Sequence, residues 1–114
     1  MNVPGGLERQ KVMQSAAVAT GNGTAVNTID VDGAFTVLTM QVTGITTATI
    51  TFEATIDGTN WVAVLATNLN NGTDATTATA NGLYRITCLG LRQVRARISA
   101  WTSGTITVTG VVCA

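Results

Sequence analysis

The sequence predicts an all-β protein: a single two-sheet antiparallel β-sandwich, jelly-roll-like, with eight or nine strands and a flexible N-terminal arm. Three observations predict this class. Threonine, a β-branched residue that weakens helices, makes up about a fifth of the chain. Apolar and polar residues alternate with a period of two, which marks strands with one buried face. Twelve glycines punctuate the chain, and the expected strands recur at a spacing of roughly 8–12 residues, which is typical of a β-sandwich or a small barrel.

The N-terminal residues 1–11 are predicted to form the arm, and residues 12–114 the single domain. The arm contains the structure-breaking run Pro4-Gly5-Gly6 and a group of charged residues. Residues 12–20 are expected to form the first strand, although their small side chains leave a short helix as an alternative.

The next strands are expected at residues 25–31 and 35–43, separated by turns at 21–23 and 30–33. The second of these segments, FTVLTMQVT, is apolar on both faces, as a central strand would be. Residues 44–47 are expected to lead from this strand into the next one.

Residues 48–65 are predicted to form a β-hairpin on which the core depends. Ile50, Phe52 and other apolar residues up to position 56 alternate with threonines and Glu53. Asp57 and Gly58 supply turn chemistry, and Trp61 opens the returning strand. We expect the large ring of Trp61 to pack into the sandwich.

The remaining segments follow the same pattern. Residues 68–79 form the most polar region, with a long turn, and strands are expected at 83–89 and 93–101. A tight turn at residues 102–104 is predicted before the last strand, 105–112, closes the sheet.

The composition argues against several classes of function. The net charge is zero and the pI is about 6.0, so no global charge draws the chain to nucleic acid or to an anionic membrane. No apolar run approaches the roughly 20 residues that span a bilayer, and no signal peptide is apparent. Cys88 and Cys113 match no disulfide framework or zinc motif, and we expect reduced thiols.

No enzyme, cofactor or metal is expected. The chain contains no histidine, which excludes Ser-His-Asp and Cys-His pairs and imidazole metal sites. Asp30 and Asp32 resemble the opening of a calcium loop, but no carboxylate follows within twelve residues, so an ordinary turn is favoured.

Arg95 and Arg97 are the candidate partner-binding residues. Two apart on one strand, they project from the same face, and Arg85 and Arg92 extend the positive group. Two interpretations are open: the arginines bind a carboxylate, phosphate or partner protein, or they pair across strands with Glu53 or Asp57. Trp101 is expected on this face as an exposed anchor or as a lid on the sandwich edge.

Two segments carry a resemblance to a known group of proteins. FEATIDGTNWVAV and GLYRITCLGLRQVRARISAWTSGTITVTGVV, within residues 49–112, resemble a pattern in small structural proteins of tailed bacteriophages. Their cadence is also similar to discoidin-type, galactose-binding-like jelly rolls. The resemblance implies hairpin roles for Asp57, Gly58 and Trp61 and an Arg-x-Arg strand at Arg95 and Arg97. It implies no catalytic residue.

The resemblance implies a virion component: a capsid decoration or cement protein, a head fibre or a tail-tip module, commonly trimeric. Our hypothesis is a non-enzymatic decoration protein, made in the host cytoplasm, that binds the capsid or a tail assembly as an oligomer, without nucleic acid or membrane. The alternative is a carbohydrate-binding module that places Trp61, Tyr84 or Trp101 along a groove for a surface glycan.

Overall fold

The computed structural model describes residues 8–30 and 33–113, and these residues fold entirely as β-structure and loops. None of the described residues belongs to a helix long and apolar enough to cross a membrane. The strands are β1 (Glu8–Ala17), β2 (Val26–Asn27), β3 (Ile29–Asp30), β4 (Gly33–Ala34), β5 (Val37–Thr55), β6 (Val62–Ala63), β7 (Ala66–Asn68), β8 (Asp74–Ala75), β9 (Thr77–Ala78), β10 (Gly82–Thr87) and β11 (Gln93–Cys113).

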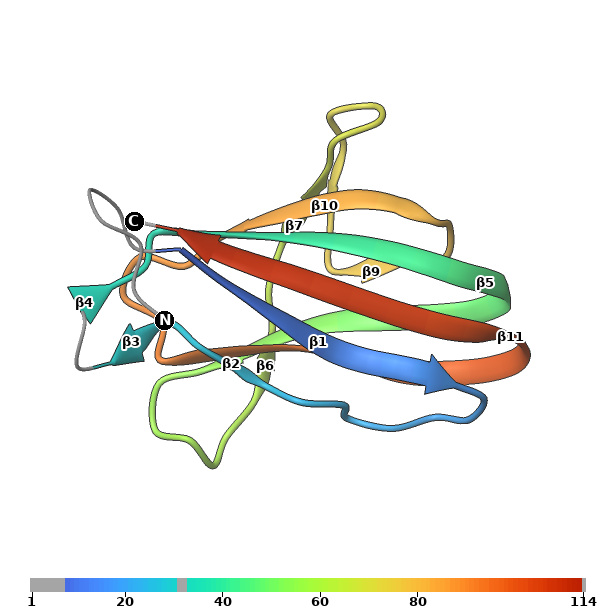
Figure 1. Ribbon diagram of the computed structural model, residues 1–114, viewed down its shortest axis with the longest axis horizontal. Coiled ribbons are helices and arrows are strands. Elements are labelled where there is room, and N and C mark those ends of the chain that lie inside the picture. The colour runs from blue at the N-terminus through green and yellow to red at the C-terminus, as the bar shows by residue number, and fades with distance from the viewer. Residues whose placement is uncertain (1–7, 31–32, 114) are drawn as a thin grey trace.

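Two long strands organise the molecule. β5 and β11, of 19 and 21 residues, pair antiparallel along nearly their whole length. Both bend at the same end of the molecule, so this two-stranded ribbon folds back over itself (Figure 1). The result is one hydrogen-bonded sheet of nine strands that forms both layers of the sandwich. The predicted all-β sandwich is confirmed.

Each layer contains half of each long strand. Layer one contains residues 37–43 of β5 and 106–113 of β11, with β1 beyond β11 and β10, β7 and β8 beyond β5. Layer two contains residues 48–55 of β5 and 93–98 of β11, flanked by β2, β6 and β9. The short pair of β3 and β4 stands apart from this sheet.

The core lies between the layers and follows the alternation in the sequence. Layer two contributes Ile50 and Phe52, and layer one contributes Leu38, Met40 and Tyr84, all almost completely buried. The Phe52 and Tyr84 ring centroids lie 5.5 Å apart, so the hairpin's aromatic residue contacts the opposite layer. The predicted importance of the hairpin for the core is confirmed for Phe52.

The link expected at residues 44–47 and the tight turn predicted at residues 102–104 are wrong, because β5 and β11 continue through these segments. Gly44 and Gly104 face each other at the bend with φ of +85° and +118°. Two paired strands that bend together need no hairpin there. Instead, the irregular register between Ile98 and Thr107 accommodates the change of direction.

The first strand begins earlier than predicted, and the helical alternative for residues 12–20 is wrong. β1 starts at Glu8, which pairs with Cys113, so residues 8–11 belong to the sheet and not to an arm. Backbone pairing with the last strand, β11, places these residues in the sheet although charged residues are frequent among them. The rest of the predicted arm, residues 1–7, lies outside the described residues.

Candidate interaction site

A cluster of three charged side chains lies on the outer face of layer two. Arg95 on β11 is the direct cross-strand partner of Glu53 on β5, and Arg97 is two residues further along. Arg95 Nη2 and Nε each lie 2.8 Å from Glu53 Oε1, and Arg97 Nε lies 3.1 Å from the same oxygen. The predicted cross-strand pairing with Glu53 is therefore confirmed, whereas Asp57 is not part of it.

Burial and hydrogen bonding act in opposite directions on the Glu53 carboxyl. Glu53 is 8% exposed, and this burial raises its pKa. Hydrogen bonds from Arg97 and Arg95, with their positive charges, outweigh burial and hold the pKa of Glu53 below its ordinary value. The cluster thus contains two guanidinium groups and one ionised carboxylate, a net charge of +1.

Trp61 covers this cluster from outside, which corrects its predicted place in the core. The guanidinium carbon of Arg95 lies 4.1 Å from the centroid of the Trp61 ring, in cation–π geometry. The returning strand β6 pairs Ala63 with Glu53, whose side chain is on the outer face. Trp61 has the same strand parity as Ala63, so its half-buried ring lies on that face as well.

The turn that carries Trp61 is fixed by Asp57. One carboxylate oxygen of Asp57 accepts the backbone N–H groups of Thr59 and Asn60, both at 2.8 Å, and the other accepts the Asn60 amide at 2.7 Å. These bonds hold the pKa of Asp57 well below its ordinary value. Gly58 adopts a φ of +81° and donates to Thr55 Oγ1. The hairpin roles predicted for this turn match its geometry.

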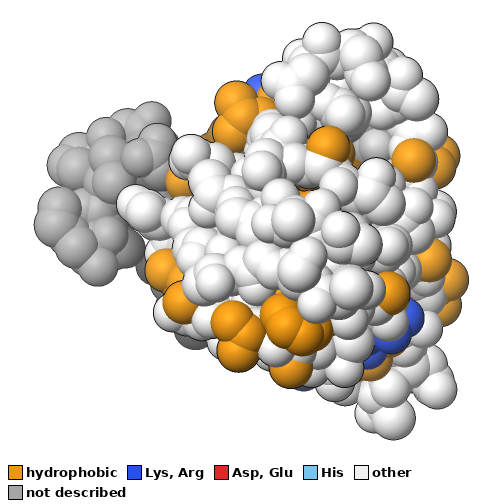
Figure 2. Space-filling model, turned by 90° about the vertical axis from the view of Figure 1, so that its right-hand side faces the viewer, with side chains coloured by type: hydrophobic (Ala, Val, Ile, Leu, Met, Phe, Trp, Pro, Cys, Tyr) orange, Lys and Arg blue, Asp and Glu red, His pale blue; other side chains and the backbone are white. Residues whose placement is uncertain are grey.

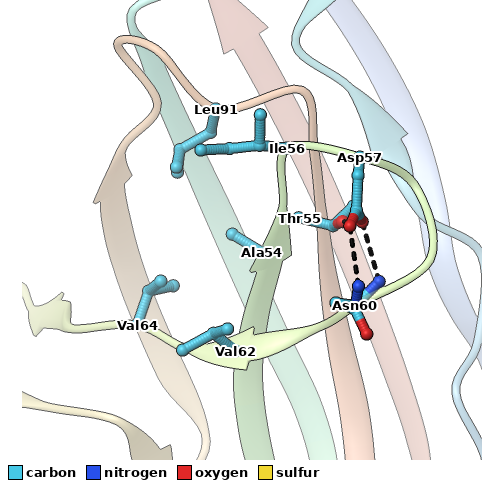
Figure 3. A pocket seen from close by; sticks show the side chains of 8 residues that line it. All are labelled: Ala54, Thr55, Ile56, Asp57, Asn60, Val62, Val64 and Leu91. Atoms are coloured by element: carbon cyan, nitrogen blue, oxygen red, sulfur yellow. Dashed lines mark hydrogen bonds between the residues drawn. The ribbon is translucent and has the colours of Figure 1, made fainter.

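Beside this turn is an apolar hollow of about 350 Å³ that the sequence reasoning missed. Figure 3 shows Ile56 and Leu91 on one side of it and Val62 and Val64 on the other, with the hydrogen-bonded Asp57 at its rim. Ile56 is 72% exposed and Val62 65% exposed. The alternation that buries Ile50 and Phe52 predicts Ile56 inside, which is wrong because the chain leaves the sheet at the turn.

A second hollow, of about 360 Å³, continues the first. Val64 and Leu91 line both, and the second adds the exposed side chains of Leu65 and Leu89 together with polar and charged residues, among them Asp74 and Arg85. Isolated exposed apolar residues are normal in proteins, but a contiguous group is not. The sequence signal for the first hollow is Ile56, an apolar residue directly before the Asp57-Gly58 turn.

The other predicted site residues lie away from the cluster. Trp101 packs partly against the core and donates its indole N–H to Gly104 O at 3.0 Å, which fits a lid and not an exposed anchor. Arg85 projects from layer one and reaches Thr39 Oγ1 at 3.3 Å. Arg92 precedes β11 in a loop. The predicted extension of the stripe to Arg85 is therefore wrong.

The aromatic residues of the carbohydrate alternative do not form a groove. Tyr84 is 3% exposed, and its hydroxyl donates to Ala80 O at 2.6 Å. Trp101 is in the bend of β11, whereas Trp61 stacks over Arg95. These three residues therefore do not form an aromatic platform on which a sugar could stack.

The two cysteines are separated by a strand and are both free. The Thr36 amide donates to Cys113 O, and the Cys88 amide donates to Thr36 O, so β5 runs between them. Two strand spacings of about 4.8 Å exceed the Cα separation a disulfide allows. Burial raises the pKa of the Cys88 thiol to about 11.

Within the described residues, no three acidic or cysteine side chains gather as metal ligands would. The predicted turn around Asp30 and Asp32 lies partly outside the described residues, so its calcium alternative stays a hypothesis.

The outer faces of layer one and layer two remain as candidate binding surfaces. The face of layer one carries few charges: outward positions on β5, β10 and β11 alternate with buried ones, and the row through Thr39 contains Arg85 on β10 and Asp74 on β8. Figure 2 shows the adjoining end of the molecule, which is mostly neutral polar with small apolar groups and few charged side chains. These features define an all-β sandwich module whose candidate binding residues lie on open faces and shallow hollows.

The chain belongs to the XepA family, whose model, described as XepA, matches residues 8–112. A comparison with curated protein sequences finds no match.

Two solved structures share the fold. The crystal structure of SPBc2 prophage-derived protein YomS is similar with a TM-score of 0.83 and 22% identity, over 98% of this chain and 97% of that one. The crystal structure of PBSX exported protein XepA has a TM-score of 0.87 and 17% identity, over 98% of this chain and 39% of that one. This chain therefore spans less than half of that XepA chain.

Proposed function

We propose that the protein is a non-enzymatic structural component of a phage or prophage particle. Its membership of the XepA family and the prophage origin of the structurally similar protein YomS support this class. In its finer form the proposal is a capsid decoration protein that binds the outside of the capsid as an oligomer, most simply a trimer. Its place would then be the virion, and its partners itself and a capsid or tail protein.

The observation that carries the proposal is the weakly charged outer face of layer one. Thr39 on the central strand β5 has Val111 on one side and Arg85 on the other, and Leu83, further along β10, is 43% exposed. Interfaces between proteins are depleted of charged residues relative to the rest of the surface, and the outward positions of β5 and of residues 106–113 of β11 on this face are uncharged. A face with few charges and no excess of positive charge suits association with proteins better than with nucleic acid or anionic lipid.

Capsids assembled without this protein provide the test. Added protein should sediment with the capsids and should have a solution mass above 11.7 kDa when alone. A Thr39→Glu variant, which places a charge at the centre of the face, should lose both properties but keep its fold. Persistent monomer and no capsid binding would contradict the finer proposal. Glycan-array binding without capsid binding would support the carbohydrate-binding alternative.

A further inference from the structure

The charged cluster of layer two is not balanced. Glu53 is the acid within 4.0 Å of Arg95 and Arg97 among the described residues, and both arginines use the same oxygen, Oε1. Two guanidinium groups on one carboxylate oxygen repel each other, and a second carboxylate would relieve this repulsion.

Arg97 is the member of the cluster that a ligand can reach. Its Nε bonds Glu53, but its two terminal nitrogens make no hydrogen bond within the described residues. The Arg97 side chain is 35% exposed, against 16% for Arg95. The Trp61 ring stacks over Arg95. The terminal nitrogens of Arg97 therefore present a planar pair of donors that matches a carboxylate in geometry.

The neighbours of Arg97 are ordered and neutral. Thr51, its cross-strand partner, donates its hydroxyl to Ser99 Oγ at 2.8 Å, and Ser99 donates to Thr49 O at 3.3 Å. The next outward position on β9 is Thr77, which pairs with Thr51. These hydroxyl side chains place no negative charge next to Arg97, so an arriving carboxylate meets no repulsion from this row.

We propose that Arg97 binds the carboxylate of an acidic side chain on a partner protein, completing a cluster of two arginines and two carboxylates. This inference deepens the proposed function, on which it rests for the presence of a protein partner. A single exposed ion pair is weak, so the contact acts within a larger interface as an element of specificity and orientation.

The test uses a fluorescently labelled, end-capped oligoglutamate peptide and measures its binding by anisotropy at constant ionic strength. Arg97→Gln should weaken binding by about three- to fivefold, as expected for a single exposed ion pair. Lys11→Gln, which removes one positive charge from an exposed position on the edge strand β1, is the control and should bind as the parent does. The Trp61 indole resonance should shift on binding in the parent and in this control.

Several outcomes would overturn the inference. One is equal binding of an oligoglutamine peptide, and another is unchanged binding by an Arg97→Gln variant whose melting midpoint is unchanged. A third is competition by inorganic phosphate that is as effective as competition by the peptide, which would indicate a general oxyanion site. Each of these outcomes leaves the proposed function intact, because capsid binding is assigned to the outer face of layer one. If the parent protein binds the peptide but does not bind capsids, that result would contradict the proposed function alone.

Discussion

At the scale of single residues, the two large aromatic side chains of the hairpin have different tasks. Phe52 is completely buried and contacts Tyr84 across the layers. Trp61 lies on the outer face and stacks on Arg95, which Glu53 holds in place from the next strand. A tryptophan beside a turn is therefore not core by default, because its strand parity decides which face it joins.

We expect this difference to appear in stability. Phe52→Ala should lower the free energy of unfolding by about 3–5 kcal/mol, since it leaves a cavity between the layers. Trp61→Ala should cost about 1 kcal/mol, the range of an exposed cation–π contact with modest packing. Urea unfolding of both variants beside the parent measures the two values. Similar losses for the two variants would show that the Trp61 ring supports the core.

At the scale of elements, the bend in β5 and β11 creates the sandwich. Gly44 and Gly104 lie opposite each other at this bend, each with a positive φ. A Cβ on Gly104 would lie 2.4 Å from Gly44 O, and one on Gly44 would lie 1.7 Å from Thr105 O. The two backbones approach too closely for any side chain, so glycine is required for steric as well as conformational reasons.

Gly104→Ala should therefore destabilise the protein by at least about 2–3 kcal/mol, because φ is positive and the clash is with backbone atoms. Gly21→Ala is the control, since its Cβ would meet no atom within 4 Å. Thermal melts followed by circular dichroism should show a large decrease for the first variant and little change for the second. Equal midpoints would mean that the bend relaxes without cost.

At the scale of the whole molecule, stability depends on few titrating groups, because charged residues are only 11% of the chain. Glu53 is held ionised by two arginines from a distant part of the sequence, whereas Cys88 is held neutral by burial. One group thus contributes to the acid limit of stability and the other to the alkaline limit.

The acid limit should reflect Glu53. Its folded pKa lies below the ordinary value of 4.5, so its contribution is complete above that pH and is lost as the pH falls through the folded value. A Glu53→Gln variant should be less stable at neutral pH and should show a shallower acid limb. Melting midpoints between neutral and strongly acid pH test this, with Asp57→Asn separating the contribution of the turn. Parallel acid limbs in parent and Glu53→Gln would contradict it.

The alkaline limit should reflect Cys88. Its folded pKa is raised to about 11 from 9.0. The stability that the neutral thiol contributes is therefore fully present below pH 9.0 and decreases as the pH rises toward 11. Ionisation of the thiol in the unfolded chain then favours unfolding. Cys88→Ala, whatever its midpoint at neutral pH, should lose this part of the alkaline slope. An unchanged slope would exclude this thiol as its origin.

Much of the fold was predictable because β-structure is a local pattern. Alternation identified the strands containing Phe52, Tyr84 and Val94, and turn chemistry identified the hairpin at Asp57. The pairing of Glu53 with the arginines was one of two interpretations, since parity places them on outer faces but gives no register. The apolar hollow around Ile56 could not be predicted, because it forms where the hairpin leaves the sheet.

The sequence by itself determined the all-β class, the alternating core and the turn held by Asp57, because these depend on neighbours along the chain. Only the tertiary structure decided that β5 and β11 continue through their glycines, that Trp61 covers Arg95, and that two arginines share Glu53. Register, bending and cross-strand charge balance depend on residues far apart in sequence, and their energies become defined only when the strands pair.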